Sequence, residues 1–144
     1  GIQSFLYADG VLTGPAGSAT VPSTPTRQDA ATTATHSHTT GATLTLTPTA
    51  GQYAYITAID IQNCATGTAV TAAAPTYITT TNITGAPQYQ IGSGVTAGLC
   101  QPVPVAPFST PLRAAAVTTA VTFVLPTFAT NQVVSVNIYW YSAP

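Results

Sequence analysis

The sequence predicts an all-β protein: an antiparallel β-sandwich or jelly roll of about seven to eight strands with an extended N-terminal arm. Three observations support this fold class. The commonest residue is Thr, whose β-branched side chain favours strands. Glu, Lys and Met, which favour helices, are absent. In addition, 12 Pro and 11 Gly separate short segments in which apolar and polar residues alternate.

The chain of 144 residues fits one domain, in which we distinguish an arm over residues 1–42 and a sandwich over residues 43–144. The arm is rich in Ala, Thr, Ser, Gly and Pro, and it has the period of neither a helix nor a strand. Its tip is apolar, and we expect this tip to dock on a neighbouring subunit; a frayed terminus is the alternative. The residues of this assembly arm are Ile2, Phe5, Leu6 and Tyr7.

Alternating patterns place the strands of the sandwich along the chain. The clearest segments are 43–47, 53–63, 76–81, 120–125 and 132–141. Shorter strands are expected near 88–91 and 109–113, and residues 92–107, rich in Pro and Gly, are expected to form a long loop.

The alternation also assigns faces to the two longest strands. In 132–141 the apolar face carries Val134, Val136, Ile138 and Trp140. In 53–63, strict alternation puts Tyr53 and Tyr55 on the same face as Thr57, Ile59 and Ile61. Aromatic residues are enriched at interface cores. Four tyrosines are therefore candidates for a subunit interface or for stacking on a ligand: Tyr53, Tyr55, Tyr139 and Tyr141.

Charge is nearly absent from this chain. Charged residues make up 3% of it, whereas ordinary globular domains carry about a quarter. A soluble monomer stays dispersed largely through surface charge. We therefore expect the surface to be covered by copies of the chain or by a larger assembly, as a homotrimer or higher oligomer with three-fold contacts. The five charged residues are Asp9, Arg27, Asp29, Asp60 and Arg113.

The same scarcity argues against several classes of function. Two Arg and no Lys leave too few cations for phosphate contacts, so we expect no nucleic-acid partner. No apolar run approaches the ~20 residues of a membrane helix, so we expect no membrane partner. Three Asp and no Glu supply no convincing carboxylate pair, and both His lie in the irregular arm. We therefore predict no enzyme, no catalytic residue and no cofactor.

Cys64 and Cys100 are the only cysteines. Cys64 follows a predicted strand and Cys100 lies in the predicted loop, so a disulfide between them is geometrically plausible. In the chain-entropy model such a bridge would contribute about 4 kcal/mol. The alternative is two buried thiols that act as small apolar residues.

His36 and His38 form the most suggestive polar pair. In an extended chain, residues two apart point the same way, so both imidazoles could reach one iron or zinc ion. A three-fold axis would bring together six such ligands, and trimeric phage spike proteins use a similar His-x-His arrangement. The alternative is two solvated histidines in a flexible arm.

The segment Asn82-Ile83-Thr84 matches the N-glycosylation sequon. Chance is the alternative in a chain this rich in Thr. The match bears on function only if the host glycosylates proteins.

Three stretches carry a resemblance to known proteins: Leu44–Thr57, Thr79–Gly85 and Phe123–Tyr141. Their overall sequence pattern, rather than a single motif, resembles that of small β-sandwich structural proteins of tailed bacteriophages, which decorate heads or form fibres and tail parts. The resemblance spans about residues 43–141 and does not cover the arm. It implies a virion structural protein without catalytic residues, whose partners are itself and a major capsid protein or another virion protein.

We therefore expect a capsid-decorating, capsid-stabilising or fibre-type subunit, located in the virion after assembly in the host cytoplasm. Two alternatives remain open at this stage, and both would place the chain outside the cell. One is a carbohydrate-binding or adhesive module that uses its tyrosines as a stacking platform. The other is a secreted filament subunit in which the arm donates a strand to the next subunit.

Overall fold

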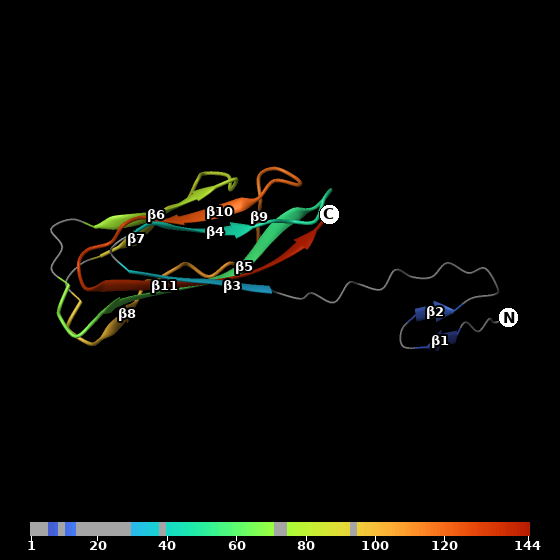
Figure 1. Ribbon diagram of the computed structural model, residues 1–144. Helices are drawn as coiled ribbons and strands as arrows, with labels where there is room; N and C mark the ends of the chain where they lie inside the picture. The colour runs from blue at the N-terminus through green and yellow to red at the C-terminus, as the bar shows by residue number, and fades with distance from the viewer. Residues whose placement is uncertain (1–5, 9–10, 14–29, 38–39, 71–74, 93–94) are drawn as a thin grey trace.

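Two antiparallel sheets pack face to face in the computed structural model, which describes residues 6–8, 11–13, 30–37, 40–70, 75–92 and 95–144 (Figure 1). The predicted all-β antiparallel sandwich is confirmed. Every strand pairing is antiparallel.

The smaller sheet has four strands in the order β4-β10-β6-β7. The alternating segments predicted for them begin or end within two residues of the observed strands. These are β4 (Ala42–Leu46), β6 (Thr76–Thr81), β7 (Tyr89–Ile91) and β10 (Val121–Leu125).

The larger sheet has five strands and is built on two long neighbours, β5 (Tyr53–Ala65) and β11 (Gln132–Ala143). The order is β3-β11-β5-β8, and β9 also pairs with β5. The flanking strands are β3 (Ala30–Ser37), β8 (Cys100–Pro102) and β9 (Leu112–Arg113).

The core lies between the two sheets. As predicted, the inward face of β11 carries Val134, Val136 and Ile138, all fully buried, while Trp140 is half-buried against the same cluster. Phe123 of β10 faces them from the smaller sheet and is also fully buried. The period-2 pattern therefore reads the buried face correctly where the strand is regular.

The predicted faces of β5 are wrong along half of the strand, because a β-bulge interrupts it. Tyr139 of β11 lies opposite Ala58, whereas the next residue, Trp140, lies opposite Ile56. Thr57 is thus the extra residue, and one extra residue exchanges the two faces. Tyr53 and Tyr55 consequently point away from the core, on the face opposite to the buried Ile61.

Part of the predicted arm belongs to the sandwich. Residues 30–37 form β3, which pairs with β11 along its whole length, from Ala30↔Trp140 to Ser37↔Val133. The sandwich therefore starts before residue 43, and the arm does not extend to residue 42. Sequence patterning missed β3 because its inward residues are mostly Ala and Thr, which give no apolar signal.

The predicted loop at 92–107 also contains a strand. β8 pairs with β5 over three residues, with Cys100 opposite Cys64. All three residues of β8 are exposed, so no alternation of apolar and polar residues could mark it.

Before residue 30 the structure describes residues 6–8 and 11–13, which form two short strands. β1 (Leu6–Ala8) and β2 (Val11–Thr13) pair with each other, with Tyr7 opposite Leu12. Ile2 and Phe5, predicted at the tip of the assembly arm, lie outside the described residues. The described residues include no helix with the length and apolar character that crossing a membrane requires.

Candidate functional site

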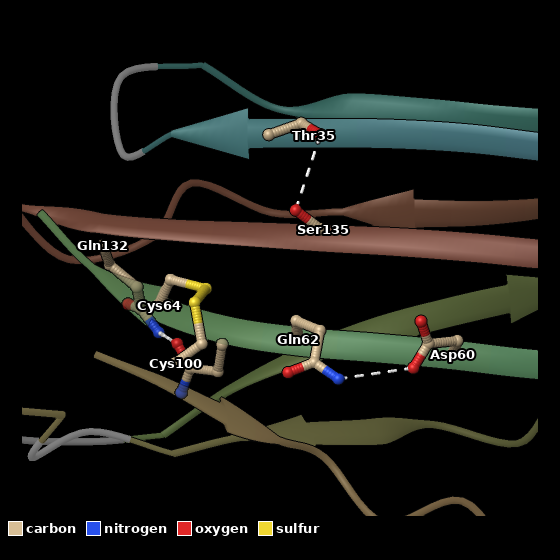
Figure 2. The surroundings of a disulfide bond; sticks show 8 residues. Thr35, Asp60, Gln62, Cys64, Cys100, Gln132 and Ser135 are labelled. Atoms are coloured by element: carbon tan, nitrogen blue, oxygen red, sulfur yellow. Dashed lines mark hydrogen bonds between the residues drawn. A yellow bond between two sulfur atoms is a disulfide. The ribbon is translucent and has the colours of Figure 1, made fainter. Parts of the chain in front are cut away.

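The outward face of the five-stranded sheet carries the groups that could recognise a partner. β11 lies at its centre, between β3 and β5, and its outward residues continue across these neighbours in rows set by the strand register. One row is Thr35–Ser135–Gln62, in which the hydroxyls of Thr35 and Ser135 lie 3.5 Å apart (Figure 2). The next row is Thr33–Asn137–Asp60, so the middle of this face carries polar groups and one carboxylate.

Aromatic side chains gather toward one end of the face, which we call the tyrosine end (Tyr53, Tyr55, Tyr139, Tyr141 and Arg113). The rings of Tyr55 and Tyr141 lie parallel, with centroids 5.1 Å apart. Tyr53 meets Tyr55 edge to face, with centroids 6.5 Å apart. The structure thus brings three of the four predicted tyrosines into one cluster.

The fourth tyrosine, Tyr139, lies on the same face beside the bulge and is 40% exposed. The extra residue of the bulge also binds the neighbouring strand, because the hydroxyl of Thr57 donates a hydrogen bond of 3.0 Å to the Tyr139 carbonyl of β11. Sequence patterning found these tyrosines by residue type, but it could not place Tyr53 and Tyr55 on the face that they share with Tyr139 and Tyr141.

The only charged side chains in the described part of the chain, Asp60 and Arg113, both belong to this sheet. The guanidinium of Arg113 lies over the Tyr53 ring, 4.6 Å from its centroid, in a cation–π contact. Asp60 accepts a hydrogen bond of 3.5 Å from the Gln62 amide (Figure 2). A partner that covers this sheet therefore meets two charged groups, of which Arg113 already has an aromatic contact.

The other end of the same sheet is held covalently. Cys64 and Cys100 form a disulfide, with their Cα atoms 3.9 Å apart, that joins β5 to β8 (Figure 2). We call this the disulfide end (Asn63, Cys64, Cys100 and Gln132). Of the two alternatives that the sequence left open, the structure contains the bridge.

A buried polar network lies beside the disulfide. Gln132 and Asn63 are each 2% exposed, and the Gln132 amide donates to the Asn63 carbonyl oxygen at 2.8 Å. Both side-chain amides also donate to the Gly92 carbonyl, and Gln132 accepts from the Ala129 N–H at 3.0 Å. The network ties β11, β5 and the segment after β7 together. Sequence patterning did not single out these residues, which are 69 positions apart.

His36 is not a solvated residue of a flexible arm. It lies on β3 opposite Val134 and is 7% exposed, with its ring 5.7 Å from that of Phe128. Its Nε2 is buried and has no hydrogen-bond partner. Pairing of β3 with β11 turns the imidazole into the core. His38, the other member of the predicted metal pair, lies outside the described residues.

No group of three or more metal-ligating His, Cys, Asp or Glu side chains occurs within the residues that the structure describes. The proposed iron or zinc site at His36 and His38 therefore gains no further ligand from the described sandwich.

Asn82 of the sequon has a structural role. Its backbone φ is 59°, and its amide group donates to the Thr119 carbonyl at 2.9 Å and accepts from the Ala116 N–H at 2.8 Å. The side-chain nitrogen that a glycan would modify is therefore already bonded to the loop before β10.

Two hollows lie along the segment that follows β8. One of about 310 Å³ lies beside the bulge, between β5 and residues 105–108. The other, of about 420 Å³, is lined by residues 88–90 with Gly92, Val103 and Pro104. Tyr89 lines the second, and burial raises the pKa of its hydroxyl above the ordinary value. The residues that line these two hollows include no charged side chain.

The outward face of the smaller sheet is uncharged and is dominated by threonine. The hydroxyls of Thr81 and Thr122 are 2.6 Å apart across β6 and β10. This face carries one large exposed aromatic residue, Tyr77, which is 43% exposed. The two outward faces therefore differ in aromatic content, and also in charge, since Asp60 and Arg113 both lie on the five-stranded sheet.

No family model, curated protein or solved structure matches this chain.

Proposed function

We propose that this chain is a virion structural protein without enzymatic activity, a capsid-decorating or fibre-type subunit. In this proposal it acts by associating with copies of itself and by docking on a capsid protein or another virion protein. The observation that carries the proposal is the outward face of the five-stranded sheet, which combines clustered tyrosines with only two charged side chains, Asp60 and Arg113.

The physical reason is the cost of desolvation. Burying an ion is costly unless it is paired and hydrogen-bonded. Aromatic rings gain from being covered, and hydroxyls can be covered at a small cost when they keep a hydrogen-bond partner. A standard interface buries about 1,600 Å² and needs no ion pairs. A surface with so few charges is better suited to permanent burial in an assembly than to a soluble monomer, which surface charge keeps dispersed.

The virion setting is supported by the resemblance of residues 43–141 to β-sandwich structural proteins of tailed bacteriophages. It also agrees with the expected insensitivity to salt. Contacts made without ion pairs are weakly screened, which suits a particle released into variable surroundings.

Two matched variants test self-association through the tyrosine end. Tyr139→Arg places a charge on the proposed interface, and Tyr77→Arg places one at a residue of similar exposure on the other sheet, since the two are 40% and 43% exposed. Sedimentation velocity should show wild-type oligomers at both low and high salt. Tyr139→Arg should dissociate them and Tyr77→Arg should not. A wild-type monomer at high micromolar concentration would contradict the proposal.

A second experiment tests the particle. An antibody raised against the purified chain should label intact phage particles that are produced from the genome encoding it, as seen by immunoelectron microscopy. Label that is absent from particles, and found instead on cells or in the medium, would favour the extracellular alternatives.

The tyrosine end also favours a second candidate, a carbohydrate-binding adhesive module. Aromatic rings beside Arg113 could contact the apolar face of a sugar ring. Because Tyr55 and Tyr141 already stack on each other, fewer ring faces are open to a sugar. Binding on a glycan array that is lost in Tyr139→Ala would support this candidate over self-association.

A further inference from the structure

We propose that the outer edge of β3 pairs with the β3 edge of a second copy, antiparallel and about a two-fold axis. The inference deepens the proposed function and rests on it, since it names a second copy of this chain as the partner and β3 as one contact.

β3 is the last strand of its sheet. It is hydrogen-bonded to β11 along one side, and no strand of the described residues pairs with its other side. Such an edge presents a row of N–H and C=O groups that can accept another strand.

The edge of β3 lacks the features that normally prevent such pairing. Folded proteins protect their edges with charged residues, proline, bulges or short strands. β3 spans eight residues, AATTATHS, without a charged residue or proline, and its register against β11 is unbroken. The other edge strands are shorter: β4 has five residues, β7 and β8 have three, and β9 has two.

The side chains of β3 are complementary to their own copy. A two-fold axis brings the same patch of each subunit together, so a patch pairs with itself only if it has no like charges to oppose. The outward row of β3 consists of Ala31, Thr33, Thr35 and Ser37. The last three carry hydroxyls, which can donate and accept, although the Thr33 hydroxyl already donates to the Asn137 carbonyl oxygen. The chain already uses such a pair within itself, between Thr81 and Thr122.

A charged partner would gain little from this strand, because β3 offers it no opposite charge. β3 reaches the tyrosine end only at Ala31, which lies opposite Tyr139, while Thr33, Thr35 and Ser37 lie further along the strand. A two-fold contact centred on these three residues is therefore compatible with a contact of other symmetry at Tyr53, Tyr55 and Tyr141. Pairing at β3 would join the five-stranded sheets of two copies into one continuous sheet.

The test uses full-length chains that carry paired charges on the edge. In T33K/T35K and in T33E/T35E, like charges would face each other across the axis whether Thr33 or Thr35 lies opposite Thr35 of the other copy. T43K/T45K is the matched control, since Thr43 and Thr45 are also exposed alternate residues of an edge strand. Far-UV circular dichroism would establish that all variants keep their strand content.

Each like-charged variant should show half the wild-type mass by sedimentation, with dimer affinity weakened by roughly 100-fold. Mixing the Lys and Glu variants should restore the mass as a heterodimer, and the control should behave as wild type. If both charged variants keep the wild-type mass, or if the mixture does not reassociate, the inference is wrong. A wild type that is itself monomeric, as expected if the chain's own N-terminal segment covers the edge, would also overturn it.

The two proposals fail separately. If Tyr139→Arg dissociates the protein while the β3 variants do not, the proposed function stands and the edge contact falls. If the β3 variants dissociate it but the chain is absent from phage particles, the edge contact stands and the virion assignment falls.

Discussion

The two ends of the five-stranded sheet use the same pair of long strands for different purposes. At the disulfide end, β5 and β11 are fixed by the Cys64–Cys100 bond and by the Gln132–Asn63 network. At the tyrosine end, the same strands present aromatic rings outward, while their inward residues Ala54 and Ile56 are fully buried in the core. The difference indicates that the covalent bond and the buried polar network lie at one end and the aromatic surface for a partner at the other.

The largest effect should follow from removing the disulfide. In C64S/C100S the unfolded chain loses a closed loop, because the bonded cysteines are 36 positions apart. The free energy of unfolding should fall by about 4 kcal/mol, and the thermal midpoint by roughly 10 °C or more. Calorimetry of the variant would measure this. Reduction of the wild type should reproduce the loss, and an unchanged midpoint would show that the disulfide end does not carry the stability assigned to it.

The second effect concerns the buried network. Gln132→Ala would leave the Asn63 carbonyl oxygen and the Ala129 N–H without their partner. Leaving buried polar groups unsatisfied should cost about 1–3 kcal/mol, measured by urea denaturation. Ser135→Ala, on the outward face of the same strand, is the control and should change stability by less than about 0.5 kcal/mol. If both variants lose the same stability, the buried Gln132 network contributes no more than the outward face of the same strand, which would contradict this prediction.

At the tyrosine end we expect a substitution to weaken self-association more than it lowers stability. Tyr55→Leu removes the stacking on Tyr141 and the hydrogen bond from the Tyr55 hydroxyl to the Pro144 carbonyl. We expect a stability loss of about 1 kcal/mol together with a clear loss of self-association, which sedimentation would measure. If stability falls as far as in C64S/C100S while association is unchanged, the tyrosine end is part of the framework rather than an interaction surface.

The smallest effect should come from His36, whose buried imidazole lies near the disulfide end. Because its Nε2 is buried without a partner, replacing the imidazole by an apolar side chain removes a desolvated polar atom. His36→Leu should therefore leave stability unchanged or raise it by about 1 kcal/mol, as read from the urea midpoint. A loss of several kcal/mol would mean that the imidazole has a structural role that these contacts do not reveal.

The sequence predicted this fold well where the strands are regular. In β11 the alternation runs without interruption, so the burial of Val134, Val136 and Ile138 follows directly from the period of a strand. β3 escaped prediction because Ala and Thr on its inward face resemble the composition of a linker. β8 escaped because pairing with β5 and the bond to Cys64 hold it in place, rather than burial of its own residues.

The candidate site was predicted in part, for a related reason. Residue type alone identified the tyrosines and the two cysteines. The position of Tyr53 and Tyr55 depends on the bulge, and nothing in the alternation of Tyr53–Asn63 marks where a register shift occurs. The pairing of Gln132 with Asn63 depends on strand register between distant segments, which local patterns do not encode.

The bulge also determines which sequence changes β5 can tolerate: substitutions at this point, but not insertions or deletions. It shifts the phase of β5 by one residue, so the outward direction of Tyr55 and the inward direction of Ile61 depend on how many residues separate them. A substitution at Thr57 would leave both directions unchanged. Deletion of one residue there would turn Tyr53 and Tyr55 toward the core and expose Ile56. Related chains should therefore vary in composition at this point while keeping its length.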